Sequence, residues 1–121
     1  MSDDEVTIAE AKELVRRFCE ERDWDQFHNP KDLAKGISTE ASELLEIFRF
    51  RSCEESYSMV TDGRTSEHIR EELADVLYFT LRFAQMNGID LSEVLKDKIM
   101  KNGLKYPVEK SRGSNLKYDE L

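Results

Sequence analysis

Apolar residues recur at helical spacing in four segments of the chain, and no segment shows sustained alternation of apolar and polar residues. The helices predicted by this pattern span roughly residues 7–22, 30–51, 65–87 and 91–101. The segment 52–64 is polar and predicts a loop with room for one helical turn. Residues 104–121 predict a mostly irregular tail. We therefore expect an all-α fold, a bundle of four main helices.

Local signals set the ends of these helices. Thr7 and Glu10 have capping-box spacing, and Asn29-Pro30 is typical of an N-cap followed by proline in the first helical position. Asn87-Gly88 predicts the end of the third helix, and Asn102-Gly103 the end of the fourth.

Length and composition predict one domain, residues 1–121, with a single core. No apolar run approaches the ~18 residues of a membrane span. The acidic start, Met1 to Glu5, lacks the basic and apolar parts of a secretory signal, so a cytoplasmic location is expected. Cys19 and Cys53 lack metal-ligand spacing and are expected to be free thiols.

The formal net charge is -8, and the chain has no basic stripe. Such a surface repels long nucleic acids, so no long nucleic-acid partner is expected. The lack of a long apolar run predicts that there is no membrane partner. A nucleotide is still compatible with this charge, because a metal ion can lie between the phosphates and the carboxylates.

Two acidic pairs stand out within the predicted helices. Glu40 and Glu43 lie in the second helix, and Glu72 and Asp75 in the third, each pair at i, i+3 spacing. At about 100° per residue, each pair lies to the same-handed side of the apolar stripe of its helix. If the two helices pack antiparallel, all four carboxylates converge on one cleft. Hard oxygen ligands of this kind suit Mg²⁺.

A simpler interpretation competes with the metal site. With 26 acidic residues in 121, chance alone gives roughly five such pairs, and most acidic pairs are a solvated helix face. On that interpretation the protein is an acidic helical interaction module.

Aromatic and phosphate-binding candidates lie outside the acidic pairs. Trp24 and His28 could contact a base. The structural alternative is that Trp24 and Phe27 fill the end of the bundle and that His28 is a hydrogen-bonded structural residue. Lys98 and Asn102 project together at i, i+4, and their simpler interpretation is a solvated lysine and a helix-capping asparagine. His68 is assigned no role.

The pattern Glu-x-x-Glu, a 28-residue spacer and Glu-x-x-Asp resembles the MazG-like all-α nucleoside triphosphate pyrophosphohydrolases, most closely the dCTP pyrophosphatase branch and its bacterial relatives. The resemblance spans roughly residues 15–120. The segments that carry it are Glu21–His28, Glu40–Leu45, Glu71–Leu77, Lys105–Val108, Ser111–Ser114 and Lys117-Tyr118.

This resemblance implies Mg²⁺-dependent cleavage of a nucleoside triphosphate, dCTP or a related or modified deoxynucleotide, to a monophosphate and pyrophosphate. The implied metal ligands, for two or three Mg²⁺ with Mn²⁺ as a substitute, are Glu40, Glu43, Glu72 and Asp75. Glu40 and Glu43 are the catalytic candidates, and Glu43 is favoured to orient the attacking water. The implied phosphate contacts are Lys98 and Asn102, and Trp24 and Tyr106 lie around the nucleoside.

The resemblance also implies a homo-oligomer, a dimer or a tetramer made of two dimers. Relatives often have Trp at the position of Phe50 and Tyr at that of Phe79. Here both residues keep an apolar wall at the substrate but lose a polar group that reads the base. A different nucleotide specificity and a non-catalytic nucleotide-binding protein are the alternatives.

Overall fold

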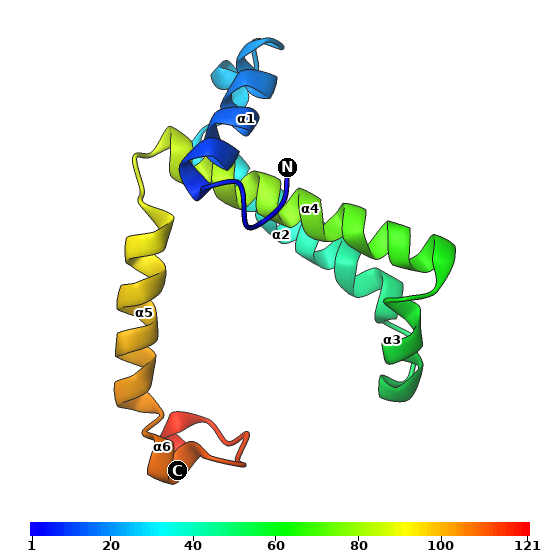
Figure 1. The fold of residues 1–121 in the computed structure, drawn as a ribbon, viewed down its shortest axis with the longest axis vertical. Coiled ribbons are helices and arrows are strands. Elements are labelled where there is room, and N and C mark those ends of the chain that lie inside the picture. The colour runs from blue at the N-terminus through cyan, green and yellow to red at the C-terminus, as the bar shows by residue number, and fades with distance from the viewer. The chain divides into compact units, whose positions relative to one another are not determined.

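The computed structural model describes all 121 residues, and every regular element in it is helical (Figure 1). The chain folds into two compact units, Met1–Gly88 and Ile89–Leu121. The elements of the first unit are α1 (Ile8–Glu20), the 3₁₀ turn η1 (Asp25–Phe27), α2 (Pro30–Phe48), α3 (Cys53–Met59) and α4 (Gly63–Met86). Those of the second are α5 (Leu91–Lys105), α6 (Val108–Ser111) and η2 (Tyr118–Glu120). The predicted all-α fold class is confirmed, and the single domain stays a prediction.

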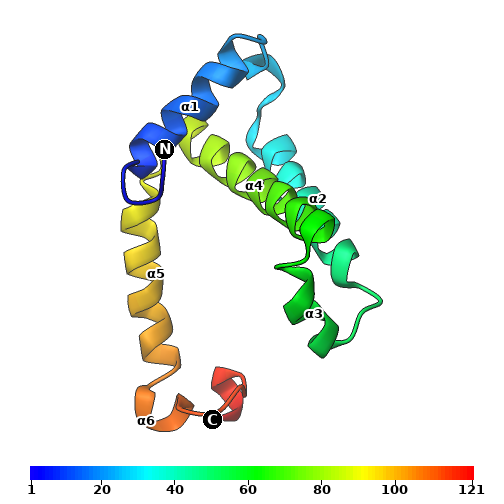
Figure 2. The ribbon, with the colours of Figure 1, turned by 45° about the vertical axis from the view of Figure 1, so that its right-hand side comes forward.

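The first unit is built on an antiparallel hairpin of α2 and α4. The two helices lie side by side, with α3 at the end where they are joined (Figures 1 and 2). Helix α1 packs on α4. At the start of α2, the side-chain oxygen of Asn29 accepts a hydrogen bond from the Asp32 N–H at 2.9 Å, so the predicted cap is present.

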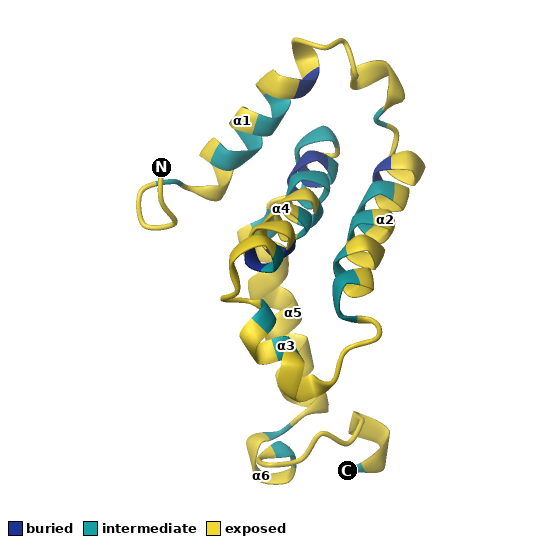
Figure 3. Ribbon diagram, turned by 90° about the vertical axis from the view of Figure 1, so that its right-hand side faces the viewer, coloured by how far each residue is buried: buried dark blue, intermediate teal, exposed yellow.

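The core of this unit is small and lies where the helices face one another (Figure 3). Its buried apolar residues are Cys19, Leu33, Ile69, Leu81 and Ala84. Several large apolar side chains stay exposed, among them Leu45 at 63% and Leu73 and Leu77 at 56% each. Exposed apolar surface of this extent favours burial against another chain, which leaves the expected homo-oligomer as a prediction.

The prediction of a loop at 52–64 is wrong for most of that segment, and α2 ends at Phe48 rather than Arg51. Helix α3 is polar, so it has no apolar stripe, and its start depends on a capping box instead. The Ser52 hydroxyl accepts from the Glu55 N–H at 3.1 Å, and the Glu55 carboxylate accepts from the Ser52 N–H at 3.3 Å. Helix α4 begins at Gly63, slightly earlier than predicted. It ends at Met86 before Gly88, whose φ of 62° suits glycine, as the sequence indicates.

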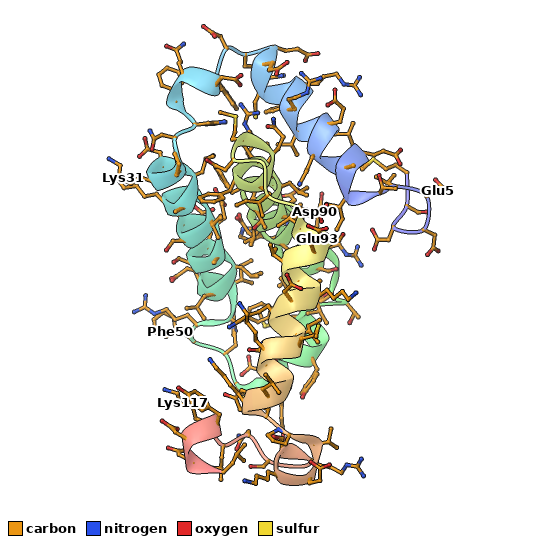
Figure 4. All side chains as sticks on the ribbon, turned by 90° about the vertical axis from the view of Figure 1, so that its left-hand side faces the viewer. Glu5, Lys31, Phe50, Asp90, Glu93 and Lys117 are labelled. Carbon is orange, nitrogen blue, oxygen red and sulfur yellow. The ribbon has the colours of Figure 1, made fainter.

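The second unit begins with α5, which Asp90 caps by accepting from the Glu93 N–H at 2.9 Å (Figure 4). The predicted stop at Asn102-Gly103 is wrong. Gly103 has no left-handed backbone, and the helix runs on to Lys105, with the Tyr106 N–H donating to the Asn102 carbonyl at 2.8 Å. The tail is not wholly irregular, because it contains α6 and η2. None of the helices combines the length and apolarity that crossing a membrane requires.

Candidate active site

Carboxylates from both helices of the hairpin meet between α2 and α4. One oxygen each from Glu40, Glu43 and Glu72 lies within 4.8 Å of the others. The two glutamates of α2 are one helical turn apart, and Glu72 faces them from the antiparallel α4. The convergence expected from the helical wheel is therefore present for these three residues.

Two oxygens in this cluster are buried and have no hydrogen-bond partner, Glu40 Oε2 and Glu72 Oε2. A buried acceptor without a donor is costly, and neighbouring carboxylates repel one another. Burial, followed by the proximity of Glu43 and Glu72 and the charge of Asp75, raises the pKa of Glu40 from near 4.5 to about 7. A hard divalent cation would bind the oxygens that lack a partner, and its charge would offset the repulsion between the carboxylates. The residues present therefore fit Mg²⁺.

Asp75, the fourth predicted ligand, lies at the edge of the cluster. Its charge contributes to the raised pKa of Glu40, and both side chains line one cavity. Asp75 is exposed, and its oxygens are not part of the compact group of three.

His68, for which the sequence pattern predicts no role, contacts the cluster. Its Nε2 lies 3.3 Å from Glu72 Oε1, which leaves Oε2 as the unpartnered oxygen of Glu72. Imidazole contacts of this kind orient carboxylate ligands. The signal was available, because His68 precedes Glu72 by four residues on one helix.

An aromatic cavity of about 490 Å³ adjoins the carboxylates. Its lining includes Phe18, Trp24, Tyr78 and Phe79 together with Glu40 and Asp75. The rings meet edge to face, with centroids 5.6 Å apart for Phe18 and Trp24 and 5.0 Å apart for Tyr78 and Phe79. The Tyr78 hydroxyl lies 3.0 Å from Cys19 Sγ. Aromatic faces beside carboxylates that fit a cation suit a base or a sugar.

Arg82 on α4 holds the turn that carries Trp24. Its side chain is fully buried, donates to His28 Nδ1 at 2.9 Å and forms an ion pair with Asp25. Burial, followed by the charge of Arg82, lowers the pKa of His28. His28 is therefore engaged in structure, which favours the structural alternative for this residue.

Sequence reasoning missed Arg82. A charged residue within the apolar run Leu81-Arg82-Phe83-Ala84 was the available signal, because an arginine in the interior needs a partner.

Within the first unit, the predicted substrate contact Phe50 is not brought to either the cluster or the aromatic cavity. Phe50 lies just past the end of α2, 83% exposed, with the Arg49 guanidinium over its ring (Figure 4). Phe27 is 59% exposed, so it does not plug the bundle. Lys98 and Asn102 on α5 and Tyr106 at its C-cap belong to the second unit, and their roles stay predictions.

Comparison with known proteins identifies the family. The sequence model of the MazG-like family matches residues 35–121, more than half of the chain. The chain belongs to the MazG-like family. Relatives of similar sequence include dCTP pyrophosphatase 1 from Bos taurus, 35% identical over 117 residues, which cover 97% of this chain and 69% of the relative. The Homo sapiens dCTP pyrophosphatase 1 is 33% identical with the same coverage.

A solved structure supports the same assignment. A pyrophosphatase from Archaeoglobus fulgidus matches with a TM-score of 0.77 and 39% sequence identity, and the match covers 83% of this chain and 92% of that one. The helical arrangement around the carboxylate cluster is thus a MazG-like fold.

Proposed function

We propose that this MazG-like protein hydrolyses a deoxynucleoside triphosphate, dCTP or a related or modified nucleotide, to the monophosphate and pyrophosphate with Mg²⁺. The enzyme class follows from the family and from relatives that are dCTP pyrophosphatases and a pyrophosphatase. The choice of base and metal is our proposal. The observation that carries it is the pair of buried, unpartnered oxygens of Glu40 and Glu72 beside an aromatic cavity.

Glu40, Glu43, Glu72 and Asp75 would hold two or three Mg²⁺, with Mn²⁺ as a substitute. Bound Mg²⁺ supplies charge neutralisation for the phosphates and acidifies water. His68 fixes the orientation of Glu72 through its 3.3 Å contact. Glu43 is exposed, and its carboxylate would accept a proton from the attacking water and orient it.

The aromatic cavity would take the nucleoside. Trp24 and Phe79 offer faces for stacking, and base–aromatic stacking contributes about 1–3 kcal/mol per base. His28 acts through the turn rather than by touching the base. Phe50, Lys98, Asn102 and Tyr106 remain proposed substrate contacts that an assembled homo-oligomer would supply, as a dimer or a dimer of dimers.

The test is pyrophosphate release from the common ribo- and deoxynucleoside triphosphates, with Mg²⁺ and with EDTA. We expect Mg²⁺-dependent release with a monophosphate product, fastest for a deoxynucleotide. Binding of nucleotide without release would favour the alternative of a non-catalytic nucleotide-binding protein. No response to Mg²⁺ would favour a helical interaction protein.

A further inference from the structure

A second cavity, of about 610 Å³, is lined by residues of α2, α3 and α4. Figure 1 shows α3 at the end of the hairpin where α2 and α4 are joined. Glu43 and Glu72 form the part of its lining that belongs to the cluster. Glu40 and Asp75 instead line the aromatic cavity. The four carboxylates therefore stand between two cavities, one aromatic and one polar.

The second cavity, called the polar cavity below, carries cationic groups that the aromatic cavity lacks, together with the apolar side chains of Ile47 and Met59. Arg64, Thr65 and His68, from the first turns of α4, line it, and Arg51 adds a second guanidinium from beyond the end of α2. Glu46 is the further acidic residue of the lining, and its carboxylate lies 3.5 Å from an Arg49 guanidinium nitrogen.

Arg64 is the cation with the most freedom to bind a ligand. Its side chain makes no hydrogen bond or ion pair. By contrast, an Arg51 guanidinium nitrogen lies 3.6 Å from a Glu55 carboxylate oxygen, and His68 Nε2 lies 3.3 Å from Glu72 Oε1. The first turn of α4 adds backbone N–H groups that the Asp62 side chain does not cap. An unpaired guanidinium beside a hydroxyl and free N–H groups suits phosphate oxygens.

The aromatic cavity, the carboxylates and the polar cavity follow one another along the hairpin. A nucleoside triphosphate has its nucleoside, α-phosphate and outer phosphates in the same order. A nucleoside in the aromatic cavity puts the α-phosphate at the carboxylates, and the rest of the triphosphate then extends past Glu43 and Glu72. We infer that Arg64, with Thr65 and His68, binds the β- and γ-phosphates and retains them as the leaving pyrophosphate. This inference rests on the proposed function for the placement of the nucleoside.

The chemistry requires such a group. Cleavage between the α- and β-phosphates breaks the bond from the α-phosphorus to the bridging oxygen, while water supplies the new oxygen on the monophosphate. The bond electrons and negative charge stay on the departing pyrophosphate. A guanidinium at its far end stabilises that charge from the side opposite the carboxylates.

Calorimetric titration of the full chain with inorganic pyrophosphate in Mg²⁺ tests the inference. Arg64→Gln should weaken pyrophosphate binding about 10-fold or more, because a charge-assisted contact is lost, while binding of the nucleoside monophosphate changes little. Arg64→Lys should restore part of the affinity. Arg70→Gln is the matched control, because Arg70 lies on α4 but lines a different surface hollow.

Equal pyrophosphate affinity in the wild type and Arg64→Gln would overturn the inference, as would absence of pyrophosphate binding by the wild type or an equal loss for both products. Turnover of the wild-type protein separates the two proposals. Pyrophosphate binding that depends on Arg64 without any triphosphate hydrolysis supports the subsite and rejects the proposed function. If the protein hydrolyses the triphosphate but Arg64→Gln leaves pyrophosphate binding unchanged, the proposed function is supported and the Arg64 subsite is rejected.

Discussion

Glu40 on α2 and Glu72 on α4 each bury one carboxylate oxygen that no hydrogen-bond donor reaches. The two residues belong to the facing helices of one hairpin, and Glu43 completes a group with oxygens within 4.8 Å. A protein that only needed a stable helical hairpin would gain by placing apolar residues here. The arrangement is instead suited to a cation, which carboxylate oxygens bind and whose charge offsets theirs.

Loss of one carboxylate should stop turnover without unfolding the protein. Loss of groups that merely orient metal ligands costs about 10–100-fold, so Glu43→Gln, Glu72→Gln and Asp75→Asn should each reduce pyrophosphate release by at least ~100-fold. Glu71→Gln, an exposed neighbour on the same helix, is the control. Helicity by circular dichroism should be unchanged in all four. Normal activity in Asp75→Asn would contradict the four-carboxylate metal site.

The metal-free protein should lose stability as the pH rises. Folding raises the pKa of Glu40 from near 4.5 to about 7, so the folded state binds this proton more tightly than the unfolded state does. The resulting contribution to stability is fully present below pH 4.5 and is lost as the pH rises through about 7. In EDTA, the melting temperature of the wild type should fall between pH 6 and pH 8, and that of Glu40→Gln should fall less. Added Mg²⁺ should stabilise the wild type more at pH 8 than at pH 6, since protons compete with the metal. An identical pH response in the two proteins would remove Glu40 as its source.

Replacing Arg82 should destabilise the first unit and loosen the turn that carries Trp24. Arg82→Met leaves Asp25 and His28 without their partner, at a cost of about 3 kcal/mol, the lower end for a broken buried pair because Asp25 is half exposed. Trp24 is the only tryptophan, so its fluorescence reports the turn directly. Arg70→Met, on the exposed face of α4, should change neither quantity. Unaltered Trp24 emission in Arg82→Met would show that the turn is held by other contacts.

Gly36 allows α2 to approach the Phe79 ring. A Cβ at this position would lie 2.5 Å from the nearest ring atoms, so Gly36→Ala should cost about 1–3 kcal/mol and displace a wall of the aromatic cavity. Phe79→Leu combined with Gly36→Ala should recover part of that stability. Gly63→Ala is the control, because nothing lies near its added Cβ. A stabilising effect of Gly36→Ala would mean that helix propensity outweighs the contact.

Assembly should depend on the exposed apolar face of α4. Leu73 and Leu77 are each 56% exposed one turn apart, and a charge there should oppose burial against a second chain. Sedimentation should show an oligomer for the wild type and a smaller species for Leu73→Arg at the same concentration. Glu71→Arg is a control for added charge beside this face. A wild type that sediments as a folded monomer would contradict the predicted oligomer.

The amino-acid pattern was enough to predict the main helices and, once α2 and α4 are antiparallel, the side of the hairpin that carries the carboxylates. These features follow from short-range periodicity, because i, i+3 spacing and the position of the apolar stripe fix where Glu40, Glu43 and Glu72 point. Stretches without such a stripe are harder to predict. The start of α3 depends on a capping box, and α5 continues past Gly103 through a further backbone hydrogen bond.

Which polar groups share the interior depends on contacts between helices that are distant in the sequence. Arg82 reaches His28 and Asp25 across 54 and 57 positions of sequence, and Gly36 meets Phe79 only because α2 and α4 pack closely. The division of the carboxylates between an aromatic and a polar cavity likewise depends on how α1, α2, α3 and α4 are arranged. Periodicity along one helix does not encode such contacts, because they depend on which residue of the neighbouring helix lies opposite.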